Sequence, residues 1–233
     1  MKPFRPDGPV RSIIHKNSKG WFASVKNRTK EKNGVVILLS VVALMWIMHT
    51  VTKNFVSDPE FIKLLATRDS FTADRALWLF MLRAHIVLAI VSLITGPVGM
   101  LRNIRTRSIA WHRWNGRIYV VSILLNFIPG LYVSWFAAGG LTVAGFLLLN
   151  LLWLGTTWLG YLHIRRKQFA EHSKWITRSF FLTYANLAIH LLLPLGQHAI
   201  GLTYASAYAF AVWGSMLLNL GLAEIFIRKK WIT

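Results

Sequence analysis

The chain has 233 residues, of which 55% are hydrophobic and only 15% are charged, and its formal net charge is +19. Soluble domains carry about 25% charged residues, so this composition excludes an ordinary water-soluble globule. The absence of cysteine excludes disulfides, thiolate metal sites, iron–sulfur clusters and covalently attached c-type haem. The basic residues cluster between alternate apolar segments, a distribution that indicates membrane topology and argues against nucleic acid as a partner.

Six apolar segments are each about 20 residues long, enough for a helix to cross roughly 30 Å of hydrocarbon. They cover residues 34–51, 76–101, 118–138, 141–162, 179–196 and 204–227. The sequence therefore predicts an all-α integral membrane bundle of six transmembrane helices in residues 34–233, preceded by a basic tail in residues 1–33. Gly139 and Gly140 predict a tight hairpin between spans three and four, and Pro97, Pro129 and Pro194 predict kinks.

The distribution of lysine and arginine predicts the orientation. Nine basic residues precede the first span, and five lie after each of the second and fourth spans, in residues 102–117 and 165–178. By the positive-inside rule both termini are cytoplasmic. We expect a multi-pass protein of the bacterial inner membrane whose basic cytoplasmic face contacts anionic lipid headgroups.

The outer connection, residues 54–75, predicts a short surface helix with Phe61, Leu64 and Leu65 on one face. Asp74 or Thr72 is expected to cap the second span. Further along the chain, "HRWNGRIYVV" (112–121) and "HSKWITRSFF" (172–181) both place a histidine, a tryptophan and an arginine just before an apolar segment. Tryptophan and arginine at such positions are also ordinary interfacial anchors.

Histidines occur at two predicted levels of the bundle. A rise of about 1.5 Å per residue places His49, His85 and His190 roughly 18–24 Å from the cytoplasmic ends of their spans. The second level, near the inner surface, holds His112, His163 and His172. Ionisable groups inside the hydrocarbon are costly and by default indicate a functional site.

Two levels of histidine on antiparallel spans are typical of a two-haem b-type cytochrome, which needs axial imidazoles from facing helices. The candidate iron ligands are His85, His190, His112 and His172, with His163 and His49 as further cofactor-binding candidates. Arg83, Arg117 and Arg178 are candidates for the haem propionates. Space for a macrocycle would come from small residues: Gly96, Gly99, Gly145, Gly155 and Gly160. The same imidazoles suit another metal, although only Glu171 supplies a carboxylate near either level.

Other polar residues within the spans favour structural roles. The four intramembrane asparagines, Asn126, Asn150, Asn186 and Asn219, are expected to join helices. Tyr119, Tyr161 and Tyr184 would suit a quinone or a proton path, but packing is the favoured role. Glu224 is expected to pair with Arg228, one helical turn away.

The segments "RAHIVLAIVSLITGPVGMLRNIRTRSIAWHRWNGRIYVV" (83–121) and "RRKQFAEHSKWITRSFFLTYANLAIH" (165–190) carry a resemblance. The chain resembles a bacterial family of multi-spanning membrane proteins known as domain of unknown function 2306. The family pattern matches at His85, Gly96, Pro97, His112, Arg113, Gly116, Arg117, His172, Trp175, Arg178 and Ser179. The resemblance implies a membrane protein and assigns it no activity.

These observations leave four functions open. The first is a haem b protein that transfers electrons, with a quinone or another membrane subunit as partner. The second is a non-redox accessory or scaffold subunit of a larger complex. The third is a small transporter, and the fourth is an acid–base membrane enzyme. Transport would need a continuous polar path between the two histidine levels, and the leucine, isoleucine and valine residues between them argue against one.

Overall fold

The computed structural model describes residues 34–65, 73–137 and 139–229, and every regular element in these ranges is helical. Five helices are long and apolar enough to cross a membrane: Gly34–Ser57, α3 (Arg75–Met100), α5 (Ile109–Trp135), α6 (Gly140–Arg165) and α9 (Tyr204–Arg228). One bent segment also meets this criterion when its two arms are taken together. The first arm is α7 (Phe169–Thr183), and the second is α8 (Ala185–Pro194) continued by the π-helix η2 (Leu195–Ala199). The all-α membrane bundle is thus confirmed, with five or six spans. The predicted basic tail, residues 1–33, lies outside the described residues.

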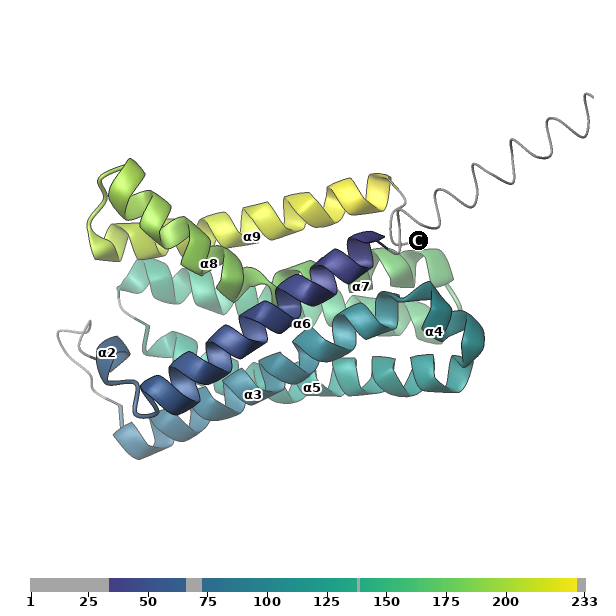
Figure 1. Cartoon of the computed structure of the whole chain (residues 1–233), viewed down its shortest axis with the longest axis horizontal. Helices are drawn as coiled ribbons and strands as arrows, with labels where there is room; N and C mark the ends of the chain where they lie inside the picture. Colours follow the sequence, from purple (N-terminus) through teal and green to yellow (C-terminus); the bar gives the residue numbers. More distant parts are fainter. Residues whose placement is uncertain (1–33, 66–72, 138, 230–233) are drawn as a thin grey trace, which may run out of the picture.

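The long helices run side by side along the long axis of the molecule (Figure 1). The most extensive packing joins α3 to α5, α6 to α7, and α8 to α9. The helix Gly34–Ser57 lies across α3 and α7, where Ala43 packs in one core cluster with Leu93 and Phe181. One end of the bundle holds the short helix α4 (Arg102–Arg107), and the opposite end holds α2 (Ile62–Leu65). These are called the α4 end and the α2 end below.

Two spans begin earlier than predicted. Helix α5 begins nine residues before the expected residue 118, and the Ser108 hydroxyl caps it by accepting a hydrogen bond of 3.3 Å from the Trp111 amide. Helix α7 begins ten residues before the expected residue 179. The added turns are rich in charged and polar residues, so hydropathy does not distinguish them from loops.

The break in the fifth span does not coincide with a proline. The chain bends by 45° at Tyr184, between α7 and α8, whereas α3 and α5 continue through Pro97 and Pro129. At the bend the Thr183 hydroxyl donates to the Ser179 carbonyl at 3.1 Å, a local side-chain bond of the kind that bends helices. The Tyr184 hydroxyl donates to the Leu39 carbonyl at 2.8 Å. This bond ties the bend to the N-terminal span.

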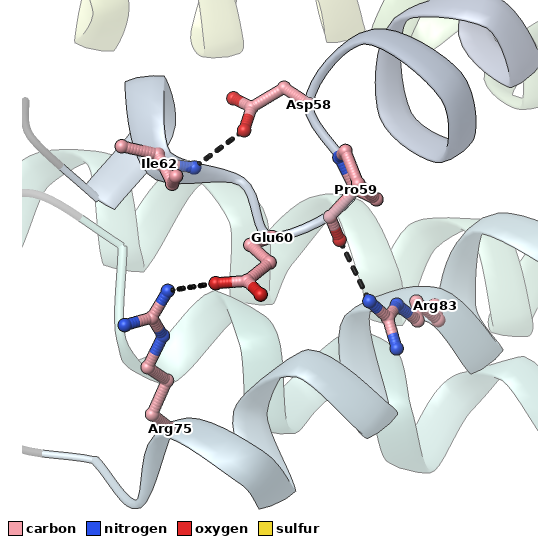
Figure 2. Close-up of polar contacts among 6 residues, drawn as sticks. All are labelled: Asp58, Pro59, Glu60, Ile62, Arg75 and Arg83. Atoms are coloured by element: carbon pink, nitrogen blue, oxygen red, sulfur yellow. Dashed lines mark hydrogen bonds and ion pairs between the residues drawn. The ribbon is translucent and has the colours of Figure 1, made fainter.

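The connection at the α2 end is held on α3 by two arginines. The Arg75 guanidinium forms an ion pair of 2.8 Å with Glu60, and Arg83 donates to the Pro59 carbonyl at 2.8 Å (Figure 2). The predicted propionate ligand Arg83 is therefore engaged in fixing this connection.

An aromatic contact completes the attachment at the α2 end. Phe61 is only 4% exposed although its φ is +54°, and its ring packs edge-on against Trp78 with centroids 6.3 Å apart. Such a backbone conformation is unfavourable for a bulky residue, so the burial of the ring stabilises it. Asp74 caps α3 as predicted, by accepting from the Leu77 amide at 2.7 Å.

Candidate functional site

Helix α5 buries a polar face and exposes an apolar one. From position 112 to position 126 the buried or half-buried polar residues recur at intervals of three and four along one side, and the last one follows eight positions later. We call them the polar stripe: His112, Asn115, Tyr119, Ser122, Asn126 and Ser134. The opposite side presents Ile118, Val121, Leu125 and Ile128, all exposed. Lipid contact accounts for the apolar side. The stripe covers 23 residues and extends over roughly 33 Å of helix from His112 to Ser134, which matches the thickness of a bilayer core.

The half of the stripe nearer the α4 end meets partners on three helices. The Asn115 amide donates to the Thr95 carbonyl of α3 at 2.7 Å. The Tyr119 hydroxyl lies 2.7 Å from the Ser179 hydroxyl of α7, which in turn lies 2.6 Å from the Thr157 hydroxyl of α6. Three helices therefore meet at a buried chain of hydroxyl groups.

One turn further along, the stripe contacts α3 again. The Ser122 and Ser92 hydroxyls lie 2.8 Å apart, and the two side chains are only 4% and 0% exposed. Ser92 also donates to the Leu88 carbonyl of its own helix at 3.0 Å. This pair lies between the hydroxyl chain and the next stripe residue, Asn126.

Asn126 faces His85, and this contact is the least satisfied part of the stripe. The two side chains lie within interaction range, but neither amide atom of Asn126 has a partner at hydrogen-bond geometry. The His85 Nδ1 is also buried without a partner. Asn126 is 1% exposed, whereas His85 keeps intermediate accessible surface. Buried polar atoms are nearly always satisfied, so the three unsatisfied atoms at this contact call for water or another polar partner.

Toward the α2 end the stripe is closed by α6. The Asn150 amide donates to the Ser134 hydroxyl at 2.9 Å and to the Phe146 carbonyl at 2.9 Å. Gly130 makes this approach possible, because a Cβ there would overlap the Asn150 side-chain oxygen and lie 3.3 Å from the His85 Nδ1. The glycine thus lets α3 and α6 place an imidazole and an amide against the backbone of α5.

The stripe adds polar side chains to the leucine, isoleucine and valine residues that the sequence places between the two histidine levels. Polar side chains from α3, α5, α6 and α7 form a series between His112 and His85, with gaps of about one helical turn. The sequence contains the signal, since residues 112, 115, 119, 122 and 126 follow a spacing of three and four. The mean hydropathy of the span does not reveal this periodic pattern.

The histidines of the level nearer the α2 end separate into two groups. His49 and His190 both contact Trp46, with ring centroids 5.1 and 5.0 Å apart. His85 instead contacts α5 and the neighbourhood of Asn150 on α6. The pairing of His85 with His190 as iron ligands stays a prediction.

Near the α4 end, two of the three predicted histidines are neighbours. The His172 Nδ1 donates to the Gly160 carbonyl at 2.8 Å, and His163 lies close enough to influence it electrostatically. His163 Nδ1 also lies 2.5 Å from the Gln168 side-chain oxygen. His112 is half-buried at the start of α5 and has interactions of its own.

The arginines expected at haem propionates have other contacts. Arg178 pairs with Glu224 at 2.6 Å and stacks over Trp175 at 4.5 Å, so Glu224 joins α9 to α7 rather than pairing with Arg228. Arg117 lies over the Trp114 ring at 5.2 Å. These contacts anchor helix ends near the α4 end of the bundle.

The glycines expected to make room for a macrocycle instead accommodate neighbouring side chains. A Cβ at Gly96 would meet the Phe180 ring, and one at Gly160 would lie 2.7 Å from Ile176. Gly145 faces Val212 and Trp213, and Gly99 faces Asn115. These positions serve close helix packing, and only Gly155 of the five has no neighbour within 4 Å. Among the described residues, no group of three histidine, aspartate or glutamate side chains converges as a metal site.

Comparison with known proteins gives one match. The model of a family described as a predicted membrane protein, DUF2306, matches residues 82–227. The chain belongs to this family. No curated protein and no solved structure matches the chain. The DUF2306 segment contains the whole polar stripe and its partners on α3, α6 and α7, whereas the N-terminal span with Trp46 and His49 lies outside it.

Proposed function

We propose that this membrane protein transfers protons along the polar stripe, between the α4 end of the bundle and His85. The observation that carries the proposal is the contact of His85 with Asn126, where three buried polar atoms lack partners in the middle of a membrane protein. Leaving such atoms unsatisfied costs about 1–3 kcal/mol each, so purely structural side chains would be expected to pair them. Water molecules at this contact would satisfy them.

Hydroxyl groups suit proton transfer because each one both donates and accepts a hydrogen bond. Two hydroxyl units support the route: Tyr119, Ser179 and Thr157 form one, and Ser92 with Ser122 forms the other. Between His112 and Asn126, successive stripe residues are three or four positions apart, or roughly 4.5–6 Å along the helix axis. One water molecule with two hydrogen bonds of about 2.8 Å covers such a gap.

His85 is the group that takes up the proton in this proposal. The neutral imidazole carries one donor and one acceptor nitrogen, so it can accept a proton on one nitrogen and release a proton from the other. In this proposal water reaches the imidazole through the polar stripe and supplies the contact that proton exchange needs. The function is therefore that of a small proton-transfer protein of the transporter class.

Proton flux into proteoliposomes tests the proposal. The purified protein is reconstituted with a pH-sensitive dye inside the vesicles, and a potassium diffusion potential drives protons inward. We expect flux above that of protein-free vesicles, and Tyr119→Phe should lower it by about fivefold or more, because one lost hydrogen-bond link changes a barrier by about 1 kcal/mol or more. Tyr132→Phe is the matched control, since Tyr132 lies on α5 outside the stripe. Flux equal to that of empty vesicles, or unaffected by Tyr119→Phe, would contradict the proposal.

A second candidate is binding of haem b, and the orientation of two imidazoles favours it. The Nδ1 atoms of His172 and His190 donate to backbone carbonyls at 2.8 and 2.9 Å, which leaves each Nε2 as the acceptor atom. Metal-ligating histidines are commonly held in this way. Membranes containing the protein, expressed with haem supplied, should then show a Soret band that His172→Ala and His190→Ala remove. A spectrum without that band rules out this candidate and leaves the proton proposal standing.

A further inference from the structure

A second polar cluster lies outside the stripe, where the N-terminal span meets α8. The Trp46 ring stacks on His49 with centroids 5.1 Å apart, and the His190 ring meets it edge-on at 5.0 Å. Lys53, one turn beyond His49, is close enough to act on His190 electrostatically. We call Trp46, His49 and His190 the aromatic cluster.

The aromatic cluster faces outward within the membrane-spanning region. His49 is exposed, and Trp46 and His190 are half-buried. His49 is 15 residues from the start of the span at Gly34, or roughly 22 Å along the helix axis, and therefore within a hydrocarbon core about 30 Å thick. Lipid tails offer no hydrogen bonds, so an exposed polar group at this depth is costly unless a membrane-soluble molecule satisfies it.

The hydrogen bond of His190 determines what such a molecule must supply. A carbonyl oxygen only accepts, so the Nδ1 that lies 2.9 Å from the Asn186 carbonyl carries the hydrogen. In the neutral ring the Nε2 is then an acceptor. Among the residues that the structure describes, none is recorded as bonding this Nε2. The position therefore calls for a hydrogen-bond donor, which a hydroxyl group can supply.

We propose that the aromatic cluster binds a membrane-soluble aromatic alcohol of the quinol class. A ring hydroxyl donates to the His190 Nε2, and the ring lies against Trp46 and His49. The apolar tail of such a molecule remains in the lipid, which the exposure of His49 and of the adjacent Met45 and Met48 permits. The site is independent of the polar stripe, with which it shares no residue.

Binding of a short-chain ubiquinol to the protein in lipid nanodiscs tests the proposal, with its dimethyl ether as the comparison ligand. The ether keeps the ring but has no hydroxyl donor. We expect the quinol to bind about tenfold more tightly than the ether, the effect of one hydrogen bond in an apolar environment. Equal affinity of the two compounds, or no saturable binding of the quinol, would overturn the proposal.

Two variants assign the binding to the aromatic cluster. His190→Phe keeps a ring but removes the acceptor, so it should abolish the difference between quinol and ether. His198→Phe is its matched control, because His198 is exposed on η2 and makes no contact with Trp46 among those recorded for the described residues. Trp46→Phe reduces the stacking surface and should weaken the binding of both the quinol and the ether. If His190→Phe still bound the quinol more tightly than the ether, or if Trp46→Phe bound both compounds as tightly as the unmodified protein, the assignment would be contradicted. Neither result bears on proton flux.

Discussion

At the scale of single residues, the four intramembrane asparagines show what sequence can and cannot predict. Their expected role in joining helices fits Asn150, which bonds Ser134 across a helix interface, whereas Asn219 bonds the Ser215 carbonyl of its own helix. Asn126 has an unsatisfied amide, and Asn186 is exposed. The residue type is the same in each case, and each asparagine lies within one of the predicted spans. The difference lies in which neighbouring helix the side chain meets, and this depends on helix packing that one span does not encode.

Gly130→Ala tests the close approach at the centre of the site. The added methyl group would overlap the Asn150 side chain and crowd the His85 ring, so the Asn150–Ser134 bond must shift or break. We expect a loss of about 1–3 kcal/mol in stability, typical of overpacking, measured by thermal unfolding in detergent. Gly155→Ala is the matched control on α6, since no atom lies within 4 Å of its added methyl group. Equal unfolding temperatures for both variants would show that the Gly130 contact is unimportant.

At the scale of helices, the apolar cores of the spans could be predicted and their polar ends could not. The predicted limits of spans two, four and six lie within three residues of those of α3, α6 and α9. Spans three and five begin nine and ten residues early, because residues 109–117 and 169–178 continue the helices as polar turns. The bend at Tyr184 depends on the hydrogen bond from Thr183 to Ser179, and proline positions therefore did not predict it.

Phe61→Ala tests how the connection at the α2 end is attached to α3. The Phe61 ring is buried against Trp78 and Leu82, so its removal should cost about 3–5 kcal/mol and lower the unfolding midpoint. Phe80→Ala provides the comparison, because Phe80 lies on α3 near the same end but is 64% exposed. A midpoint for Phe61→Ala as high as that of Phe80→Ala would contradict the attachment.

At the scale of the whole molecule, the sequence predicts the α4 end to be cytoplasmic, because the basic residues of the connections gather there. The chain has no cysteine, so single introduced cysteines can be labelled without background. In intact cells, a membrane-impermeant maleimide should label Ala199→Cys at the α2 end. Arg166→Cys at the α4 end should react only after the membrane is permeabilised. Labelling of Arg166→Cys in intact cells would reverse the predicted orientation.

The central claim is that water enters the polar stripe and reaches His85 and Asn126. Solid-state NMR in lipid bilayers measures this directly, by the rate at which magnetisation from water builds up on individual side chains. The account predicts rapid build-up on the His85 imidazole and the Asn126 amide, compared with slow build-up on the buried apolar side chain of Leu93. Build-up on His85 and Asn126 as slow as on Leu93 would show a dry interior and contradict the account.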